Sequence, residues 1–224
     1  MREKRIITAA LTGSIHTPSM SPYLPVTPEQ LIEEAVRAYE AGAAVAHVHV
    51  RNPETGLPCA DQELFRTVAA GVKKRCDMVV CCTTGGRLGE LVENRVRVVA
   101  SLSPELATLN AGSLNFALFH IADNYTEWKY DWEQNYLQAS EDFIFPNTFL
   151  TMRQFLERFA PQSTKPEFEI YDTGMINNLA FLIEKGIVKK PVYLQFVMGI
   201  LGGIPATIEN FVFLLESARK TIGD

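Results

Sequence analysis

Short runs rich in β-forming residues alternate with helical patterns along most of this chain, and this alternation limits the possible folds more than any other feature. The runs that predict strands are 5–11, 45–50, 78–82, 106–109, 168–171 and 192–197. The patterns that predict helices are 28–41, 61–74, 88–100, 148–160, 175–185 and 207–221. Such an alternation produces right-handed βαβ units and a parallel sheet with helices packed against it.

Two α/β architectures show this alternation, the open doubly wound sheet and the (β/α)8 barrel. A nucleotide-binding doubly wound sheet normally has a glycine-rich turn after its first strand, whereas segment 11–14 holds one glycine. An eight-unit barrel usually takes about 250 residues, and this chain of 224 residues shows six units. We therefore expect one α/β domain over residues 1–224, built as about the first six βα units of a (β/α)8 TIM barrel and incomplete at its C-terminal side.

Segment 115–147 interrupts the alternation and is longer than an ordinary loop between a strand and a helix. It gathers four aromatic residues among acidic and amide residues: Trp128, Tyr130, Trp132 and Tyr136. We expect an insertion that packs on the barrel surface or at a subunit interface, with a lid over the substrate as the alternative.

Charge and hydropathy exclude several classes of partner. The net charge is −5 and no block of lysine and arginine occurs, so we expect no nucleic-acid or anionic-membrane partner. No run approaches the roughly 18 apolar residues of a membrane span, and run 6–11 is too short for a signal peptide.

The four cysteines, Cys59, Cys76, Cys81 and Cys82, lack the spacing of a disulfide framework. They predict free thiols in a cytoplasmic protein.

The strongest chemical signal is the pair His47 and His49 in the run 46–51. Residues two apart in a strand lie on the same face, so both imidazoles, and Arg51 with them, project to one side. The run ends the second strand, and barrel enzymes place their active sites at the carboxyl ends of strands. Two imidazoles there favour Zn²⁺ or a similar divalent ion, and two packed histidines are the structural alternative. Arg51 is a candidate catalytic or anion-binding residue, or part of a structural ion pair.

Polar residues end the other predicted strands at the same edge. In 83–87 and 107–112, small hydroxyls, amides and glycines suit the binding of a carboxylate or phosphate, although a plain turn explains them equally well. On the fifth strand, alternation puts Glu167, Glu169 and Tyr171 on one face. An acid on the inner face of a barrel is costly unless it is paired or functional. We therefore predict Glu169 as a catalytic residue on the floor of the site.

Taken together, these strand ends resemble the β-keto acid cleavage enzyme family, which includes the 3-keto-5-aminohexanoate cleavage enzymes. The matching segments occur in order over nearly the whole chain, at 8–13, 40–43, 47–49, 84–86, 107–112, 166–171 and 195–199. Each segment alone is common, whereas their combination is specific.

The resemblance implies a zinc-dependent acyl exchange, in which a β-keto acid and acetyl-CoA give acetoacetate and a new acyl-CoA. It implies that His47 and His49 hold the zinc and that the assembly is a homo-oligomer, a tetramer. Carbon–carbon cleavage beside a carbonyl makes an enolate, and a Lewis acid on its oxygen lowers that barrier. The predicted substrate-binding residues are Ser14, Thr83, Gly86, Thr108 and Asn110.

Two departures from the family pattern matter. The family's third metal ligand is a glutamate on a later strand, near a catalytic aspartate and arginine, and these would lie beyond Asp224. The aminohexanoate enzymes also carry a glutamate after the first strand that meets the substrate ammonium, whereas this chain has Ser14, Ile15 and His16. We therefore expect that a cationic amino substrate is not preferred.

Two rival functions stay open at this point. A metal-dependent hydrolase of the amidohydrolase type also uses two histidines on a barrel strand, but normally on the first strand and with further histidines. Here only His16 and His120 remain. A non-catalytic barrel that binds a metabolite is the second rival.

Overall fold

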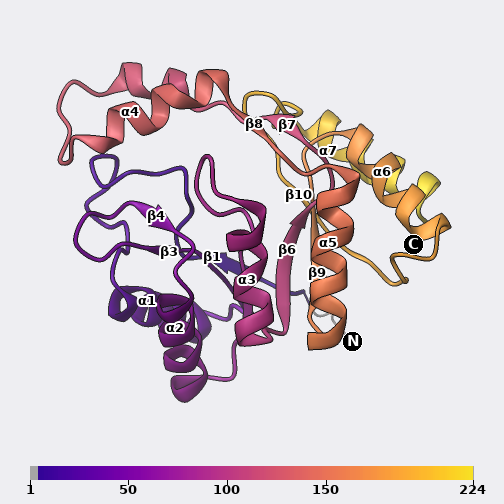
Figure 1. Cartoon of the computed structure of the whole chain (residues 1–224), viewed down its shortest axis with the longest axis horizontal. Coiled ribbons are helices and arrows are strands. Elements are labelled where there is room, and N and C mark those ends of the chain that lie inside the picture. Colours follow the sequence, from indigo (N-terminus) through magenta and orange to yellow (C-terminus); the bar gives the residue numbers. More distant parts are fainter. Residues whose placement is uncertain (1–4, 224) are drawn as a thin grey trace.

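The six predicted strands form one parallel sheet in the computed structural model, which describes residues 5–223 (Figure 1). In space they follow the order of the chain, and each strand pairs in parallel with its neighbour. The strands are β1 (Thr8–Ala10), β2 (Val45–Val48), β5 (Val79–Cys82), β6 (Leu106–Asn110), β9 (Lys165–Ile170) and β10 (Tyr193–Phe196). This is the arrangement of the first six strands of a (β/α)8 barrel, so the predicted fold class is confirmed.

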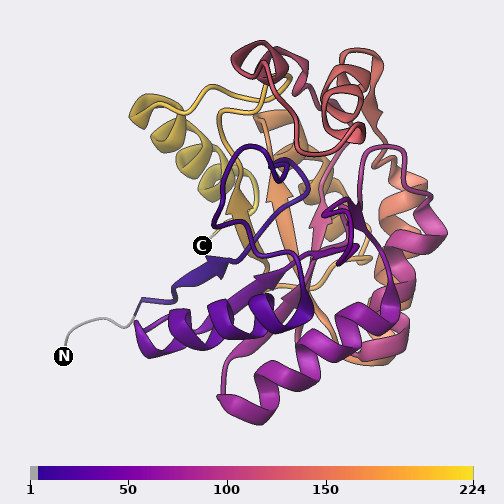
Figure 2. The ribbon, with the colours of Figure 1, turned by 90° about the vertical axis from the view of Figure 1, so that its left-hand side faces the viewer.

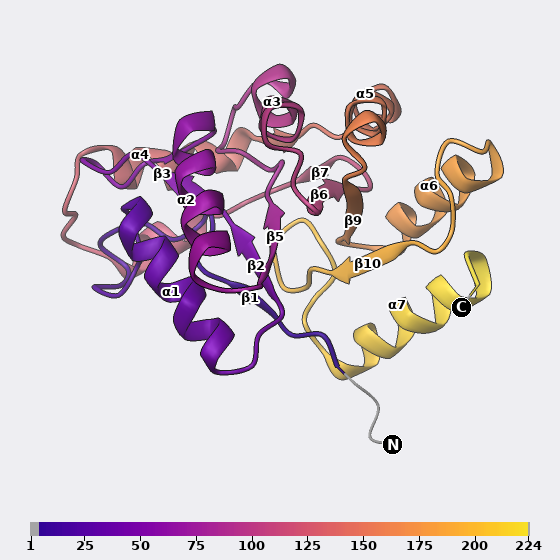
Figure 3. The ribbon, with the colours of Figure 1, turned by 90° about the horizontal axis from the view of Figure 1, so that it is seen from below.

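The predicted helices follow the strands and surround the outer face of the curved sheet, as Figure 3 shows from below. They are α1 (Pro28–Glu40), α2 (Gln62–Arg75), α3 (Val92–Leu102), α5 (Phe149–Phe159), α6 (Thr173–Glu184) and α7 (Ile208–Thr221). At the start of α1, Thr27 Oγ1 accepts a hydrogen bond from Gln30 N at 3.3 Å, and Gln30 Oε1 accepts one from Thr27 N at 3.0 Å. This reciprocal cap explains why the helix begins at the predicted position. No helix in the described part of the chain is long and apolar enough to cross a membrane.

The two faces of the sheet differ in chemistry. Alternate strand residues such as Ala46 and Leu109 pack outward into two apolar clusters with the helices. The residues between them project to the inner face, where five side chains with polar or ligand atoms are buried: His47, Cys81, Thr108, Asn110 and Glu167. Because buried polar groups are costly, this inner face is where a functional site is expected.

The strand register brings these inner-face residues together. His47 pairs with Cys81 across β2 and β5, and Thr108 pairs with Glu167 across β6 and β9. Beyond β2, the chain forms a short antiparallel hairpin of β3 (Val50–Arg51) and β4 (Pro58–Cys59).

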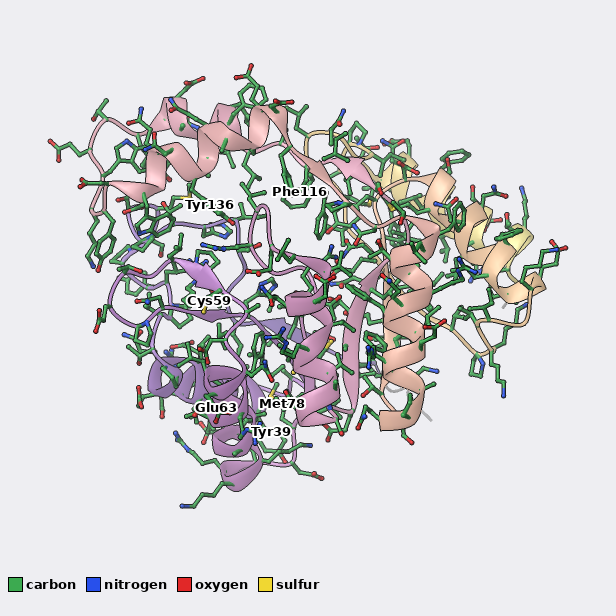
Figure 4. All side chains as sticks on the ribbon, in the orientation of Figure 1. Tyr39, Cys59, Glu63, Met78, Phe116 and Tyr136 are labelled. Atoms are coloured by element: carbon green, nitrogen blue, oxygen red, sulfur yellow. The ribbon has the colours of Figure 1, made fainter. Side chains whose placement is uncertain are left out.

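Segment 115–147 lies over the loops at the carboxyl ends of the strands (Figure 2). Its elements are η1 (Phe119–Asn124), α4 (Trp132–Gln138), η2 (Ala139–Asp142) and β8 (Ile144–Phe145), and β8 pairs antiparallel with β7 (Leu114–Asn115). The Tyr136 hydroxyl donates to the Ser14 carbonyl at 2.9 Å, and Trp132 Nε1 donates to the Thr55 carbonyl at 3.1 Å. Tyr136 and Phe116 lie on the side of the segment that faces the sheet (Figure 4). The segment is thus tied to the loops around the inner face.

Candidate active site

The imidazoles of His47 and His49 converge at the carboxyl end of β2. Their Nε2 atoms lie 3.1 Å apart, and the ring planes are tilted by 31°. Two nitrogen ligands on a tetrahedral zinc ion, with Zn–N bonds of about 2.0–2.1 Å, are about 3.3 Å apart. The observed separation therefore fits two ligands of one metal ion.

Burial keeps both imidazoles in the form that binds metal. Removal from water lowers the pKa of His47 to about 4. Burial, followed by the charges of His47 and Arg51, also lowers the pKa of His49 well below its ordinary value. Both rings are therefore neutral at pH 7, and a neutral imidazole has a lone pair free for a cation.

The other side of the His47 ring is unsatisfied. Within the described part of the chain, its Nδ1 atom is buried and has no hydrogen-bond partner. A carboxylate oxygen of Glu167 lies 4.0 Å from Nδ1 and 4.0 Å from Cys81 Sγ, and donor atoms of the three residues lie within 4.8 Å of one another. Nitrogen, sulfur and carboxylate donors suit Zn²⁺, so the residues present fit a divalent ion of this kind.

A cavity of about 120 Å³ opens beside His49 at the carboxyl ends of the strands. Of the predicted site residues, Ser14, Thr83 and Glu169 line it together with His49. Much of the remaining wall is apolar or aromatic: Ile15, Leu88, Phe116, Phe143, Phe145 and Tyr171. This combination of a few polar groups with an apolar wall is typical of a small-molecule site.

Glu169 is the most perturbed acid on this wall. Burial, and then the neighbouring charge of Glu167, raises its pKa to about 7, although a hydrogen bond from the Tyr171 hydroxyl and the charge of Arg95 oppose the rise. The Tyr171 hydroxyl lies 3.3 Å from Glu169 Oε2. An acid with a pKa near neutrality can both hold and release a proton at the pH of the cell.

Three residues predicted to bind substrate do not line this cavity. Gly86 has a φ of +68°, and a Cβ there would lie 2.9 Å from the Cβ of Glu90, so the turn itself requires glycine. Thr108 joins β6 to the loop after β5, since its Oγ1 accepts from Thr84 N at 3.1 Å and its carbonyl accepts from Thr84 Oγ1 at 2.6 Å. Asn110 is buried on β6 with an unpartnered side-chain amide among the described residues.

The contacts of Arg51 favour a structural role for this residue over a catalytic one. Its guanidinium donates to Thr12 Oγ1 at 3.0 Å, to the Gly56 carbonyl at 2.8 Å and to the His16 carbonyl at 2.8 Å, and also to the Gly13 carbonyl. It is fully buried and does not line the cavity. Arg51 thus holds the loop after β1 against the β3–β4 hairpin.

We expect Arg51→Gln to lower the free energy of unfolding by about 3 kcal/mol, because three loop carbonyls and the Thr12 hydroxyl lose a buried charged donor. Metal content per folded molecule should stay unchanged. Urea unfolding and metal analysis check both parts, with the exposed Arg66→Gln as the control. Native stability combined with lost metal would instead support a direct role at the site.

The sequence did not single out Arg95, a buried arginine of α3. It donates to the Thr84 carbonyl at 2.6 Å and to Asn147 Oδ1 at 2.6 Å, and it stacks over the Phe145 ring at 4.6 Å. Arg95 therefore joins the loop after β5 to the aromatic wall. A lone arginine on the apolar side of a helical pattern is the signal that could have revealed it.

The sequence model of the beta-keto acid cleavage enzyme family matches residues 4–224 of this chain. This chain belongs to the beta-keto acid cleavage enzyme family. The resemblance inferred from the strand ends is thereby confirmed, and the family is one of enzymes.

Several known proteins are similar to this family member. The 3,5-dioxohexanoate:acetyl-CoA acetone transferase of Paraburkholderia graminis is 41% identical over 222 residues, which cover 99% of this chain and 72% of that protein. The 3-keto-5-aminohexanoate cleavage enzyme of Acetoanaerobium sticklandii is 36% identical over 216 residues, covering 96% and 70%. A ternary complex of ObcA with a C4-CoA adduct and oxalate superposes with a TM-score of 0.63 and 22% identity, covering 80% of this chain and 38% of that one. This last likeness concerns the fold alone.

Proposed function

We propose that this protein is a zinc-dependent β-keto acid cleavage enzyme that exchanges acyl groups between a β-keto acid and acetyl-CoA. The products are acetoacetate and a new acyl-CoA. The observation that carries the proposal is the convergence of the two Nε2 atoms of His47 and His49, 3.1 Å apart, beside a largely apolar cavity. The names of the relatives, an acetyl-CoA acetone transferase and a keto acid cleavage enzyme, support the two substrates.

The reaction breaks the bond between C2 and C3 of the keto acid. The acyl group at C3 passes to the sulfur of CoA, and the acetyl group of acetyl-CoA joins C2 to form acetoacetate. His47 and His49 would hold the zinc through Nε2. Zinc, when bound, supplies a Lewis acid for the keto and carboxylate oxygens of the substrate.

The lining residues divide the remaining tasks. Glu169, with a pKa raised to about 7 by burial, can hold or release a proton at its carboxylate at neutral pH. Thr83 and Ser14 would orient the substrate, since both line the cavity beside His49. The aromatic wall of Phe116 and Phe145 excludes water, which favours transfer to CoA over hydrolysis.

The positions of the two other histidines disfavour the hydrolase alternative. His16 and His120 are both exposed and neither lines the cavity, so no further imidazole joins the pair in the described structure. Membership of an enzyme family likewise disfavours a non-catalytic barrel.

The proposal is tested by incubating the purified protein with a panel of β-keto acids, with and without acetyl-CoA and Zn²⁺. We expect acetoacetate and a new thioester only when all components are present. Release of the free acid in water, without any need for acetyl-CoA, would support the hydrolase instead.

We also expect the protein to prefer an uncharged side chain on the keto acid. Among the described residues, Ser14 and Ile15 line the cavity after β1, and Arg87 adds a positive charge to the wall. Glu169 is the carboxylate among the described lining residues, and burial raises its pKa to about 7, so it is only partly charged at neutral pH. An ammonium group buried in this cavity is therefore costly. The specificity constant kcat/KM should be at least about 10-fold lower for the amino substrate, 3-keto-5-aminohexanoate, than for 3-ketohexanoate, a loss of about 1.4 kcal/mol.

These two substrates share the same carbon chain and differ only in the amino group, so the comparison isolates the effect of adding that group. The variant Ser14→Glu should narrow the gap between them, because it adds a carboxylate to the cavity wall. Equal or faster turnover of the amino substrate by the native protein would contradict this expectation.

A further inference from the structure

We propose that Glu167 is a positioning residue, whose carboxylate accepts the Nδ1 proton of His47 and thereby turns Nε2 of that ring toward the metal. This inference deepens the proposed function and rests on its metal site. No residue role for Glu167 follows from the motif of two histidines alone, because Glu167 lies 120 positions further along the chain.

The first observation is the state of the His47 ring. Its Nε2 atom already faces Nε2 of His49 at 3.1 Å, while its Nδ1 atom is buried without a hydrogen-bond partner among the described residues. The His47 side chain is only 9% exposed, so water is largely kept from Nδ1. A histidine that binds metal through one nitrogen generally donates from the other to a carboxylate, a carbonyl or water.

The second observation is the placement of Glu167. Its side chain is 2% exposed, and its Oε1 atom lies 4.0 Å from His47 Nδ1. Within residues 5–223, its ion-pair contact is with this histidine and not with a lysine or arginine. A shift of about 1 Å, which rotation about the side-chain bonds of a glutamate allows, would bring the oxygen to hydrogen-bond distance.

A competing arrangement would place the ion among His47, Cys81 and Glu167, whose donor atoms lie within 4.8 Å of one another. The cavity decides between the two arrangements. His49 lines the cavity, whereas Cys81 is completely buried and does not. An ion held by the two Nε2 atoms can reach a substrate, and an ion held at Cys81 lies beneath the site.

The test is titration of the metal-free protein with Co²⁺, followed by its visible absorption. Glu167→Leu removes the acceptor at similar size and should weaken Co²⁺ binding about 10–100-fold. Glu167→Gln keeps a neutral acceptor and should restore most of that loss. Cys81→Ser should bind Co²⁺ as the native protein does.

Native affinity in Glu167→Leu would overturn the inference, and so would a loss in Cys81→Ser accompanied by loss of a thiolate-to-cobalt absorption band. If Glu167→Leu does not fold, ¹⁵N spectra of the native zinc-loaded protein decide instead. A proton on Nδ1 of His47 is expected, and a proton on Nε2 would refute the inference. Retention of metal by both His47→Ala and His49→Ala would instead disprove the proposed zinc-dependent function. The failure of that function can therefore be told apart from the failure of the inference about Glu167.

Discussion

Replacing either His47 or His49 by alanine is expected to abolish zinc binding and to reduce acyl exchange by about 1,000-fold or more. Each substitution removes one of two nitrogen donors that lie 3.1 Å apart. A metal that acts as a Lewis acid contributes several kcal/mol to the transition state, and about 1.4 kcal/mol corresponds to a factor of ten in rate. Loss of the ion should therefore remove at least three powers of ten.

The measurement is zinc content after dialysis, together with the rate of acetoacetate formation. His120→Ala is the matched control, because His120 is exposed and does not line the cavity. This control should keep both its zinc and its activity. Undiminished zinc in both His47→Ala and His49→Ala would disprove the metal site.

Glu169→Gln is expected to lower activity by at least about 100-fold, the usual contribution of an acid–base group, while making the metal-free protein more stable above pH 7. The two effects have one cause. Burial raises the pKa of Glu169 from 4.5 to about 7. The same burial gives the residue a proton that it can exchange at neutral pH and makes its charged form costly.

The sign of the stability change follows from the proton balance. Between pH 4.5 and about 7, the folded protein holds a proton on Glu169 that the unfolded chain has released. Stability therefore falls as pH rises through this window, by up to about 3 kcal/mol. Glutamine cannot ionise, so Glu169→Gln does not lose this stability. At pH 8 its free energy of unfolding should exceed that of the native protein by up to about 3 kcal/mol.

Thermal unfolding of the metal-free proteins at pH 5 and pH 8 checks this expectation. The Tm of Glu169→Gln should exceed that of the native protein by about 5 °C or more at pH 8, with a much smaller difference at pH 5. Glu157→Gln, an exposed acid of α5, is the control and should behave as the native protein at both pH values. A variant with native activity, or one without added stability at pH 8, would show that Glu169 does not have this role.

Elements set by short-range patterns were predictable from the sequence. Helix α1 begins at Pro28 because Thr27 and Gln30 cap each other, and both residues are neighbours in the chain. The convergence of His47 and His49 likewise follows from the period of a strand, which needs no knowledge of other strands. Asp172 caps α6 in the same local way by accepting a hydrogen bond from Met175 N at 3.2 Å.

Long-range packing decided the features that the sequence left open. Arg51 is a sequence candidate for binding an anion, yet it donates to the His16 carbonyl in the loop after β1. Arg95, which the sequence did not single out, donates to the Pro146 carbonyl, 51 positions away in the chain. The phenylalanines of segment 115–147 line the cavity only because that segment folds over the strand ends. No local pattern encodes which of its aromatic residues will face inward.

The sequence by itself determined the barrel-type alternation and the pair His47 and His49, because each depends on residues close together in the chain. The tertiary structure alone decided that Glu167 and Cys81 lie beside His47. It also decided that the turn at Gly86 requires a glycine. Those outcomes depend on the register between strands and on the space that a side chain would occupy. Both are properties of the packed molecule, in which residues far apart in sequence compete for the same volume.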